Sequence, residues 1–154
     1  MTSSEQKFRE ILDKVDSNIK LITFQESTKT SQQAADALKT NLSQIGKSIV
    51  FKTKKGKFIL VIASGMHRIN EKTIEKEVND EIIKVDANEI KEYVGYPIGG
   101  IPPFGHDNPM IIFIDKELLK FETIFCAGGT PNIVFQTTPK EILKITSAKA
   151  INVN

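Results

Sequence analysis

The fold is decided by residues 48–63, which have the sequence S-I-V-F-K-T-K-K-G-K-F-I-L-V-I-A. Two runs rich in β-branched and aromatic residues, 48–53 and 57–63, flank the turn Lys54-Lys55-Gly56. Such runs on either side of a short glycine-containing turn predict a β-hairpin. We therefore expect a sheet that is built around this hairpin.

Helical and extended patterns alternate on both sides of the hairpin. Phe8, Ile11, Leu12 and Val15 follow the i, i+3, i+4, i+7 spacing of an amphipathic helix. Helices are predicted at 4–16, 30–38, 71–78, 87–94 and from 139 onward, and strands at 19–24, 82–85, 110–114, 121–126 and 133–136.

Capping residues indicate where several of these helices begin and end. Thr30 or Ser31 can cap the second helix. Asp86 with Glu89 three residues later predicts a capping box, and Gly95 predicts the end of the same helix. Because no repeat, low-complexity tract or linker interrupts these elements, we predict one α+β domain over residues 1–154.

The composition excludes several classes of protein. The longest strongly apolar run, residues 58–63, is far shorter than the roughly 20 residues that a membrane-spanning helix needs. No signal sequence opens the chain, and the single cysteine, Cys126, excludes an internal disulfide. We therefore expect a cytoplasmic protein that does not act at a membrane.

The net charge of +2 is small, whereas proteins that bind duplex DNA usually carry a stronger basic bias. We therefore expect no DNA partner. A local group of lysines within residues 47–57 can still contact phosphates. The same lysines are equally typical of the solvent-exposed side of a strand and its turn, and the pattern alone leaves both interpretations open.

The triplet Gly46-Lys47-Ser48 resembles the end of a nucleotide-binding P-loop. That motif also needs a glycine at position 41, where this chain has Asn41, and it must follow a strand and open a helix. Here a predicted helix precedes the triplet and a predicted strand follows it. The sequence therefore excludes a P-loop.

Lys47 interrupts an apolar side of the predicted strand that Ile45, Ile49 and Phe51 share. An ammonium group on the inner side of a strand must either lose its proton or meet an anion or a carbonyl group. A surface lysine is the common alternative, and spacing alone does not exclude it. Lys47 is nonetheless a better candidate for a functional site than Lys54 or Lys55.

Two loops rich in glycine and proline are candidates for the rest of a site. Residues 95–109 contain four glycines and four prolines, and residues 127–132 form a second such loop. Long loops of this kind are more often functional than simple connections, and glycine lets a ligand approach the main chain. His106 and His67 are the only histidines, and no metal-ligand spacing is visible, so we expect no metal.

Five segments of the chain form an ordered set of motifs. Residues 44–51, Q-I-G-K-S-I-V-F, resemble Q-I-[VA]-K-[TS]-L-V-F, and residues 95–106, G-Y-P-I-G-G-I-P-P-F-G-H, resemble G-[YF]-x-x-G-G-V-P-P-x-G-H. The other three are residues 60–65 with Arg68, the segment around Asp115, and residues 127–132, which are similar to D-x-R-V, V-x-x-D-x-x-L and A-G-T-P-N motifs. In this order they resemble the YbaK/EbsC, or aminoacyl-tRNA editing, family, which is similar to the insertion domain of bacterial prolyl-tRNA synthetase.

The resemblance implies an α+β fold with a mixed or antiparallel curved sheet flanked by helices. It also implies a cofactor-independent enzyme that hydrolyses the ester between a wrong amino acid and the 3′ end of a transfer RNA. The amino acid would be small, such as alanine, serine, threonine or cysteine, and tRNA(Pro) is one candidate carrier. An aminoacyl-tRNA synthetase is a further implied partner.

The resemblance also assigns roles to residues. Lys47 would hold the RNA 3′ end, and the backbone of residues 99–103 would position the ester and the attacking water. The predicted catalytic residues are therefore Lys47, Gly99 and Gly100, and the predicted substrate-binding residues are Ser48, Ile101, Pro102, Pro103, Gly105, His106, Gly128, Gly129, Thr130 and Asn132. Two alternatives remain: a non-catalytic module that binds tRNA or a synthetase, and a protein that binds a small molecule or nucleotide.

Overall fold

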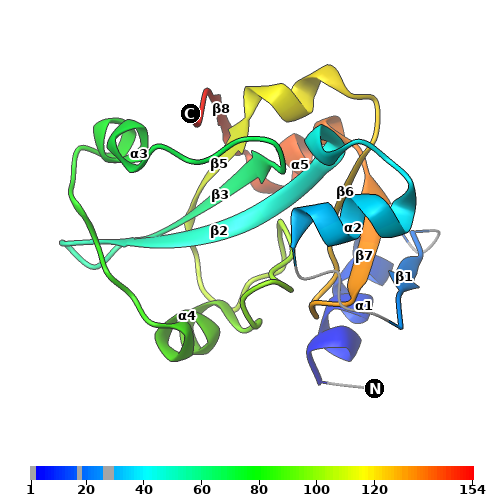
Figure 1. Cartoon of the computed structure of the whole chain (residues 1–154). Coiled ribbons are helices and arrows are strands. Elements are labelled where there is room, and N and C mark those ends of the chain that lie inside the picture. Colours follow the sequence, from blue (N-terminus) through cyan, green and yellow to red (C-terminus); the bar gives the residue numbers. More distant parts are fainter. Residues whose placement is uncertain (1–2, 17–18, 26–29) are drawn as a thin grey trace.

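A computed structural model describes residues 3–16, 19–25 and 30–154 of the chain (Figure 1). Its helices are α1 (Ser3–Val15), α2 (Ser31–Leu38), α3 (Glu71–Val78), α4 (Ala87–Val94) and α5 (Pro139–Thr146), with short 3-10 helices η1 (Leu42–Gln44) and η2 (Lys116–Lys120). Its strands are β1 (Leu21–Thr23), β2 (Ile45–Thr53), β3 (Phe58–Ser64), β4 (Ile82–Ile83), β5 (Ile111–Asp115), β6 (Ile124–Ala127), β7 (Ile133–Thr137) and β8 (Lys149–Ile151).

The predicted hairpin is confirmed as β2 and β3, which pair antiparallel from Gly46 opposite Ser64 to Lys52 opposite Phe58. Every residue of β3 is buried, so this strand lies at the centre of the fold. β2 begins three residues earlier than predicted, at Ile45. Gly46 and Lys47 continue the pairing with β3, and a short parallel pairing with β6 adds Ile45, since Ile45 and Gly46 meet Phe125 and Cys126.

The sheet runs in the order β1-β7-β6-β2-β3-β5-β8, and β4 pairs with β2 off this path. The pairs β2–β6, β3–β5 and β5–β8 are parallel and the others are antiparallel. The prediction of an α+β fold with a mixed sheet is therefore confirmed, and Figure 1 shows the curvature of β2. β8 was not predicted.

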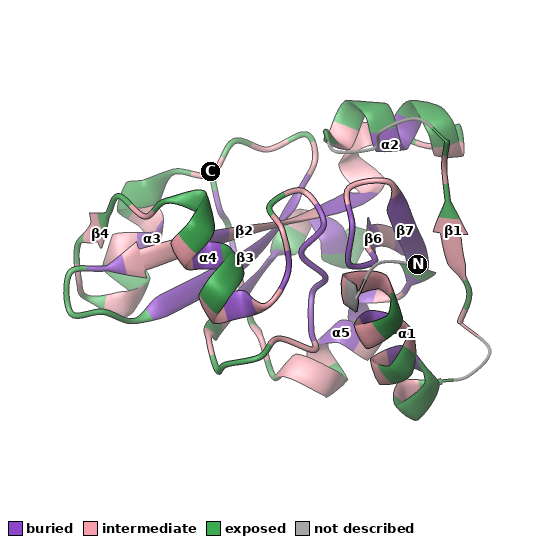
Figure 2. Ribbon diagram, turned by 90° about the horizontal axis from the view of Figure 1, so that it is seen from below, coloured by how far each residue is buried: buried purple, intermediate pink, exposed green. Residues whose placement is uncertain are grey.

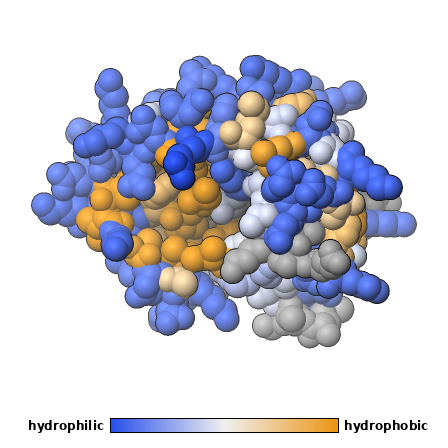
Figure 3. Space-filling model, viewed as in Figure 1, coloured by the Kyte–Doolittle hydropathy of each residue, from blue (hydrophilic) through white to orange (hydrophobic). Residues whose placement is uncertain are grey.

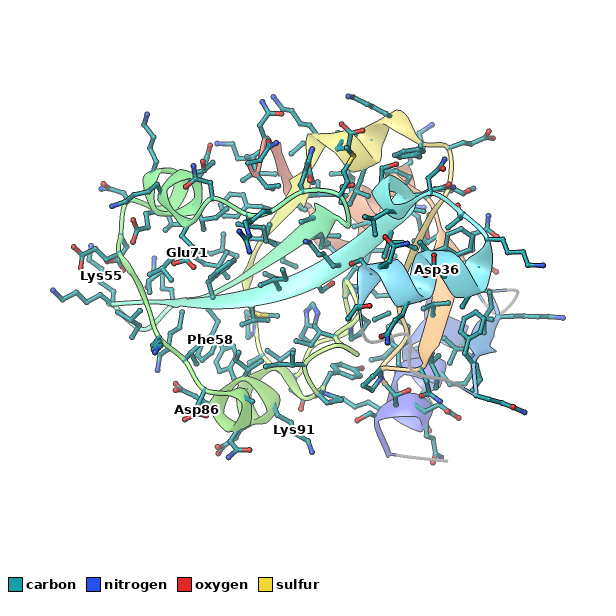
Figure 4. All side chains as sticks on the ribbon, in the orientation of Figure 1. Asp36, Lys55, Phe58, Glu71, Asp86 and Lys91 are labelled. Atoms are coloured by element: carbon teal, nitrogen blue, oxygen red, sulfur yellow. The ribbon has the colours of Figure 1, made fainter. Side chains whose placement is uncertain are left out.

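Alternate residues of the hairpin enter two different parts of the core. On one face Leu60 and Ile62 pack with α4, on the other Ile59 and Val61 pack with Ile74 of α3. Figure 1 shows α3 and α4 on opposite sides of the hairpin, and Figure 2 shows the buried strands between them. Phe58 points toward α4 (Figure 4), where its ring stacks on Tyr93 with 3.9 Å between centroids. The sheet is thus covered on both faces.

The predicted caps are present, with one difference. Thr30 caps α2 in a full capping box with Gln33, and Asp86 accepts a hydrogen bond from the backbone N–H of Glu89. The Glu89 side chain, however, pairs with Lys52 of β2, so it ties α4 to the hairpin. None of the described helices is both long and apolar enough to cross a membrane.

Helix α1 packs against the first glycine-proline loop, residues 95–109. Phe8 is fully buried, and its ring packs against Tyr96 and Phe104 of the loop and against Phe135 of β7, with centroids 5.2 to 6.2 Å apart. Lys7 pairs with Asp107 and donates a hydrogen bond to the Gly95 carbonyl at 3.2 Å. The loop is therefore fixed to the fold at several points along its length.

Candidate functional site

A cavity of about 420 Å³ lies beside the start of β2. Its walls come from the N-terminal end of α2, from residues 45–49 of β2, from Ile98, Gly99 and Ile101 of the first loop, and from β6 and β7. Most lining side chains are apolar, and among the residues that the structure describes Lys47 is the only basic one. Figure 3 shows apolar side chains gathered over β2 between hydrophilic surroundings. The cavity can therefore enclose a small ligand that carries a polar or anionic group.

One edge of β2 is open beside this cavity. Along that edge β6 pairs only with Ile45 and Gly46, and β4 only with Lys52 and Thr53. Within residues 3–16, 19–25 and 30–154, no strand pairs with residues 47–51 on this side. Alternate N–H and C=O groups of an unpaired strand edge point outward and are free to bind a partner. The cavity wall thus offers main-chain hydrogen bonds as well as side chains.

Lys47 lines the cavity, and its ammonium meets a carbonyl group, one of the two solutions that its predicted inner position allows. Nζ donates a hydrogen bond of 2.6 Å to the backbone oxygen of His67. Burial lowers the pKa of Lys47, nearby Arg68 lowers it further, and the carboxylate of Asp115 raises it in opposition. The result is a partly desolvated cation with N–H groups left for a ligand.

Asp115 and His67 form a buried pair behind this lysine. The Asp115 carboxylate is 1% exposed, and its Oδ2 lies 2.8 Å from His67 Nδ1. It also accepts hydrogen bonds from the backbone N–H groups of Ser64 and Glu117. The sequence analysis assigned neither residue to the site. The available signal was a carboxylate at the end of an otherwise apolar strand, because such a group needs a partner when buried.

Ser48 contributes a hydroxyl group with an unusual environment. The residue lines the cavity, and its buried Oγ has no hydrogen-bond partner among the described residues. Buried polar atoms in native proteins nearly always have a partner, so an orphan beside a cavity suggests that a ligand supplies it.

Ser48→Ala is therefore expected to leave the free energy of unfolding unchanged or to raise it by up to about 1 kcal/mol, because the orphan hydroxyl is removed. Chemical denaturation of both proteins measures this difference. Ser48→Cys is the control for shape, since its Sγ takes about the place of Oγ but hydrogen-bonds only weakly. A clear loss of stability in Ser48→Ala would mean that the hydroxyl has a structural partner.

The two glycine loops are in contact with each other. The N–H of Gly129 donates a hydrogen bond of 2.9 Å to the Gly100 carbonyl. A Cβ atom on Gly100 would lie 2.6 Å from the Cα of Thr130, so only glycine fits there. Gly99 has a φ of 90°, which favours glycine, and it faces the cavity. Gly100 and Gly129 therefore join the loops, whereas Gly99 forms part of the cavity wall.

Most other predicted site residues also make contacts within the two glycine loops or with the elements that pack against these loops. Nε2 of His106 donates to the Pro102 carbonyl at 2.7 Å, and burial lowers the pKa of His106. Thr130 and Asn132 are hydrogen-bonded to each other, and Asn132 donates to the Phe24 carbonyl. Pro102 and Pro103 are buried, Gly105 packs on Ile11 of α1, Gly129 on Ser4 of α1, and Gly128 on Ile133 and Leu21.

The structure thus divides the predicted site residues into two groups. Lys47, Ser48, Gly99 and Ile101 line the cavity. The remaining ones hold the loops that carry Gly99 and Ile101. Their direct contact with a substrate stays a prediction.

The described residues contain no group of three His, Cys, Asp or Glu side chains that could hold a metal ion. Cys126 is buried next to Gly46, and burial raises the pKa of its thiol to about 12. A thiol in this environment is a poor nucleophile, because the thiolate is the reactive form. The chemistry of the cavity accordingly centres on Lys47 and on main-chain groups.

Comparison with known proteins gives matches over most of the chain. Residues 25–145 match the family model described as aminoacyl-tRNA editing domain. YwhH from Bacillus subtilis is 32% identical over 126 residues, which cover 82% of this chain and 80% of YwhH. A proline–tRNA ligase from Kosmotoga olearia is 32% identical over 102 residues, 66% of this chain but 17% of the ligase. A crystal structure of a protein described as a candidate trans-editing enzyme for prolyl tRNA synthetase has 32% identity and a TM-score of 0.92, and covers 100% of this chain and 98% of that one.

Proposed function

The chain belongs to the aminoacyl-tRNA editing domain family, and from this premise we propose that it is a trans-editing hydrolase that deacylates mischarged aminoacyl-tRNA. The substrate carries a small amino acid such as alanine, serine, threonine or cysteine, and tRNA(Pro) is one candidate carrier. The whole chain, residues 1–154, acts as one cytoplasmic deacylase domain without a cofactor. An aminoacyl-tRNA synthetase is a further proposed partner.

One observation carries this proposal: Lys47 and the backbone of Gly99 line the same largely apolar cavity. A lysine binds phosphate or ester oxygens as a point charge. One of its N–H groups is held by His67, which leaves the others for the 3′ end of the RNA. The apolar remainder of the cavity suits a small amino-acid side chain.

The geometry supports hydrolysis without a side-chain nucleophile. An aminoacyl ester is already activated, so positioning of a water molecule and polarisation of the carbonyl supply much of the rate acceleration. Main-chain groups of Gly99 and of the open β2 edge, which both adjoin the cavity, are donors and acceptors suited to that task. A cavity of limited size also excludes the larger correct amino acid, as the second sieve of an editing system does.

A panel of transfer RNAs charged with alanine, serine, threonine, cysteine or proline tests the proposal. We expect release of at least one of the small amino acids at a rate well above spontaneous hydrolysis. Binding of both charged and uncharged tRNA without any release would instead identify a non-catalytic binding module. Binding of neither would exclude a role on tRNA.

The pH dependence of deacylation follows from the environment of Lys47. The charged form binds the anionic 3′ end, so activity is present below the pKa of Lys47 and is lost as the pH rises through it. Because burial lowers that pKa from the ordinary 10.5, the loss is expected below pH 10.5. Initial rates between pH 6 and pH 10, corrected for spontaneous ester hydrolysis in the absence of enzyme, measure this limb. An activity that keeps rising with pH after this correction would contradict a charged Lys47.

A further inference from the structure

Asp115 lies at the end of β5 and joins two elements that are far apart in the sequence. Its Oδ2 accepts the backbone N–H of Ser64 at 3.0 Å and contacts Nδ1 of His67 at 2.8 Å. Its Oδ1 accepts the backbone N–H of Glu117 at 2.9 Å. One buried carboxylate thus holds both ends of the turn of residues 64–67, which follows β3.

From this geometry we propose that Asp115 and His67 are positioning residues, which fix the turn of residues 64–67 so that the His67 carbonyl holds the Lys47 ammonium at the cavity wall. The role as a positioning pair in deacylation rests on the proposed function. The spatial arrangement of Asp115 and His67 is independent of that function.

The turn has little freedom to move away from Lys47. The backbone N–H of His67 donates to the Ser64 carbonyl at 2.9 Å, which closes the turn. The backbone N–H of Gly65 donates to the Ile45 carbonyl at 2.7 Å, and Oγ of Ser64 donates to the Ser43 carbonyl at 2.8 Å. The turn is therefore anchored to the start of β2 as well as to β5. At the far end of the turn, where the carbonyl bound by Lys47 lies, the Asp115–His67 contact adds a side-chain anchor to β5.

The pair also supplies charge. The carboxylate of Asp115 raises the pKa of Lys47, whereas burial and the neighbouring Arg68 lower it. Within residues 3–16, 19–25 and 30–154, Cys126 is the only other titratable group that lines the cavity, and its thiol is buried and neutral. Removal of the Asp115 charge should therefore lower the pKa of Lys47. A side chain that only filled space would have no such effect.

Three substitutions test the positioning role. Asp115→Asn removes the charge at nearly constant volume, and we expect kcat/KM for deacylation to fall about 100-fold, the scale of a misplacement of about 1 Å. His67→Ala should lower kcat/KM in the same direction. His67→Asn should restore part of the loss, because its amide nitrogen takes about the place of Nδ1. Glu117→Gln is the matched control, since it removes a nearby carboxylate whose side chain pairs with exposed Lys120.

A direct measurement on Lys47 separates positioning from folding. Lysines labelled by ¹³C reductive methylation report their own pKa in NMR titrations, and the Lys47 signal is assigned by its absence in Lys47→Arg. In folded Asp115→Asn the Lys47 pKa should be lower than in the unaltered protein, and in Glu117→Gln it should be the same. An unchanged pKa in Asp115→Asn, or full activity of His67→Ala, would overturn the proposal. A shifted pKa in a protein that deacylates no tRNA would refute the proposed function but support the pairing.

Discussion

Replacing Lys47 by alanine is expected to reduce deacylation of mischarged tRNA by roughly 1,000-fold, the upper range for loss of one preorganised polar group in an active site. The substitution removes the one cationic side chain that the described part of the chain contributes to the cavity wall. The fold should remain intact, because the side chain makes a single hydrogen bond, to the His67 carbonyl. Burial also disfavours the charged form of Lys47, so its removal does not cost the folded state a favourable charge.

Single-turnover deacylation and thermal unfolding of the same preparation measure these two effects. Lys54→Ala is the matched control: this lysine lies at the tip of the same hairpin, its side chain is 72% exposed, and its ion pair with Glu81 is long at 3.9 Å. Near-normal turnover in Lys47→Ala would remove Lys47 from the mechanism. Equal losses in both variants would point to general electrostatic attraction of RNA.

Gly100→Ala is expected to lower both stability and activity. Its Cβ would lie 2.6 to 2.8 Å from three backbone atoms of Thr130, which cannot move as a side-chain end can. Relief of this overlap must push the two loops apart and break the Gly129–Gly100 hydrogen bond. We expect a loss of roughly 3 kcal/mol in the free energy of unfolding, in the range for an overpacked core. Because Gly99 adjoins this position, deacylation should fall as well.

Gly56→Ala is the control for Gly100→Ala, because it separates the effect of steric crowding on stability from the effect of backbone strain. Gly56 has a φ of 89° but no atom within 4 Å of a built Cβ, so its substitution should cost only about 1 kcal/mol of conformational strain. Gly100 has no positive φ, so crowding alone accounts for its effect. Urea denaturation of both variants, with deacylation measured well below their melting temperatures, makes the comparison. Equal stability of the two variants would show that the loops separate easily.

Local signals in the sequence predicted most of the fold. The hairpin of residues 48–63, the limits of α3 and the caps Thr30 and Asp86 all depend on residues close together in the chain. The sequence did not predict β8 or the three extra residues of β2. β8 and the first residue of β2, Ile45, depend on parallel pairing with strands distant in sequence, β5 and β6, which no local pattern reveals. Gly46 and Lys47 extend the antiparallel pairing with β3.

The candidate site shows the same division. Lys47 was found because it interrupts an apolar alternation within a few residues. The His67–Asp115 contact joins residues 48 positions apart, so the pairing cannot be inferred from either segment alone. The glycines were interpreted as giving a ligand access to the main chain. Gly100 and Gly129 instead let the main chains of the two loops approach and hydrogen-bond to each other. This contact becomes evident only in the folded structure.

Helix α1 has a consequence for engineering. The segment that matches the family model begins at residue 25, after α1 ends at Val15. Phe8 and Lys7 nevertheless hold the first loop, and both Gly105 and Gly129 pack directly on this helix. If the matched segment alone were transplanted into a host protein, Lys47 and the hairpin would be present. Helix α1, on which both glycine loops pack, would be missing. The host protein would have to provide another aromatic side chain that packs against the first loop in place of Phe8.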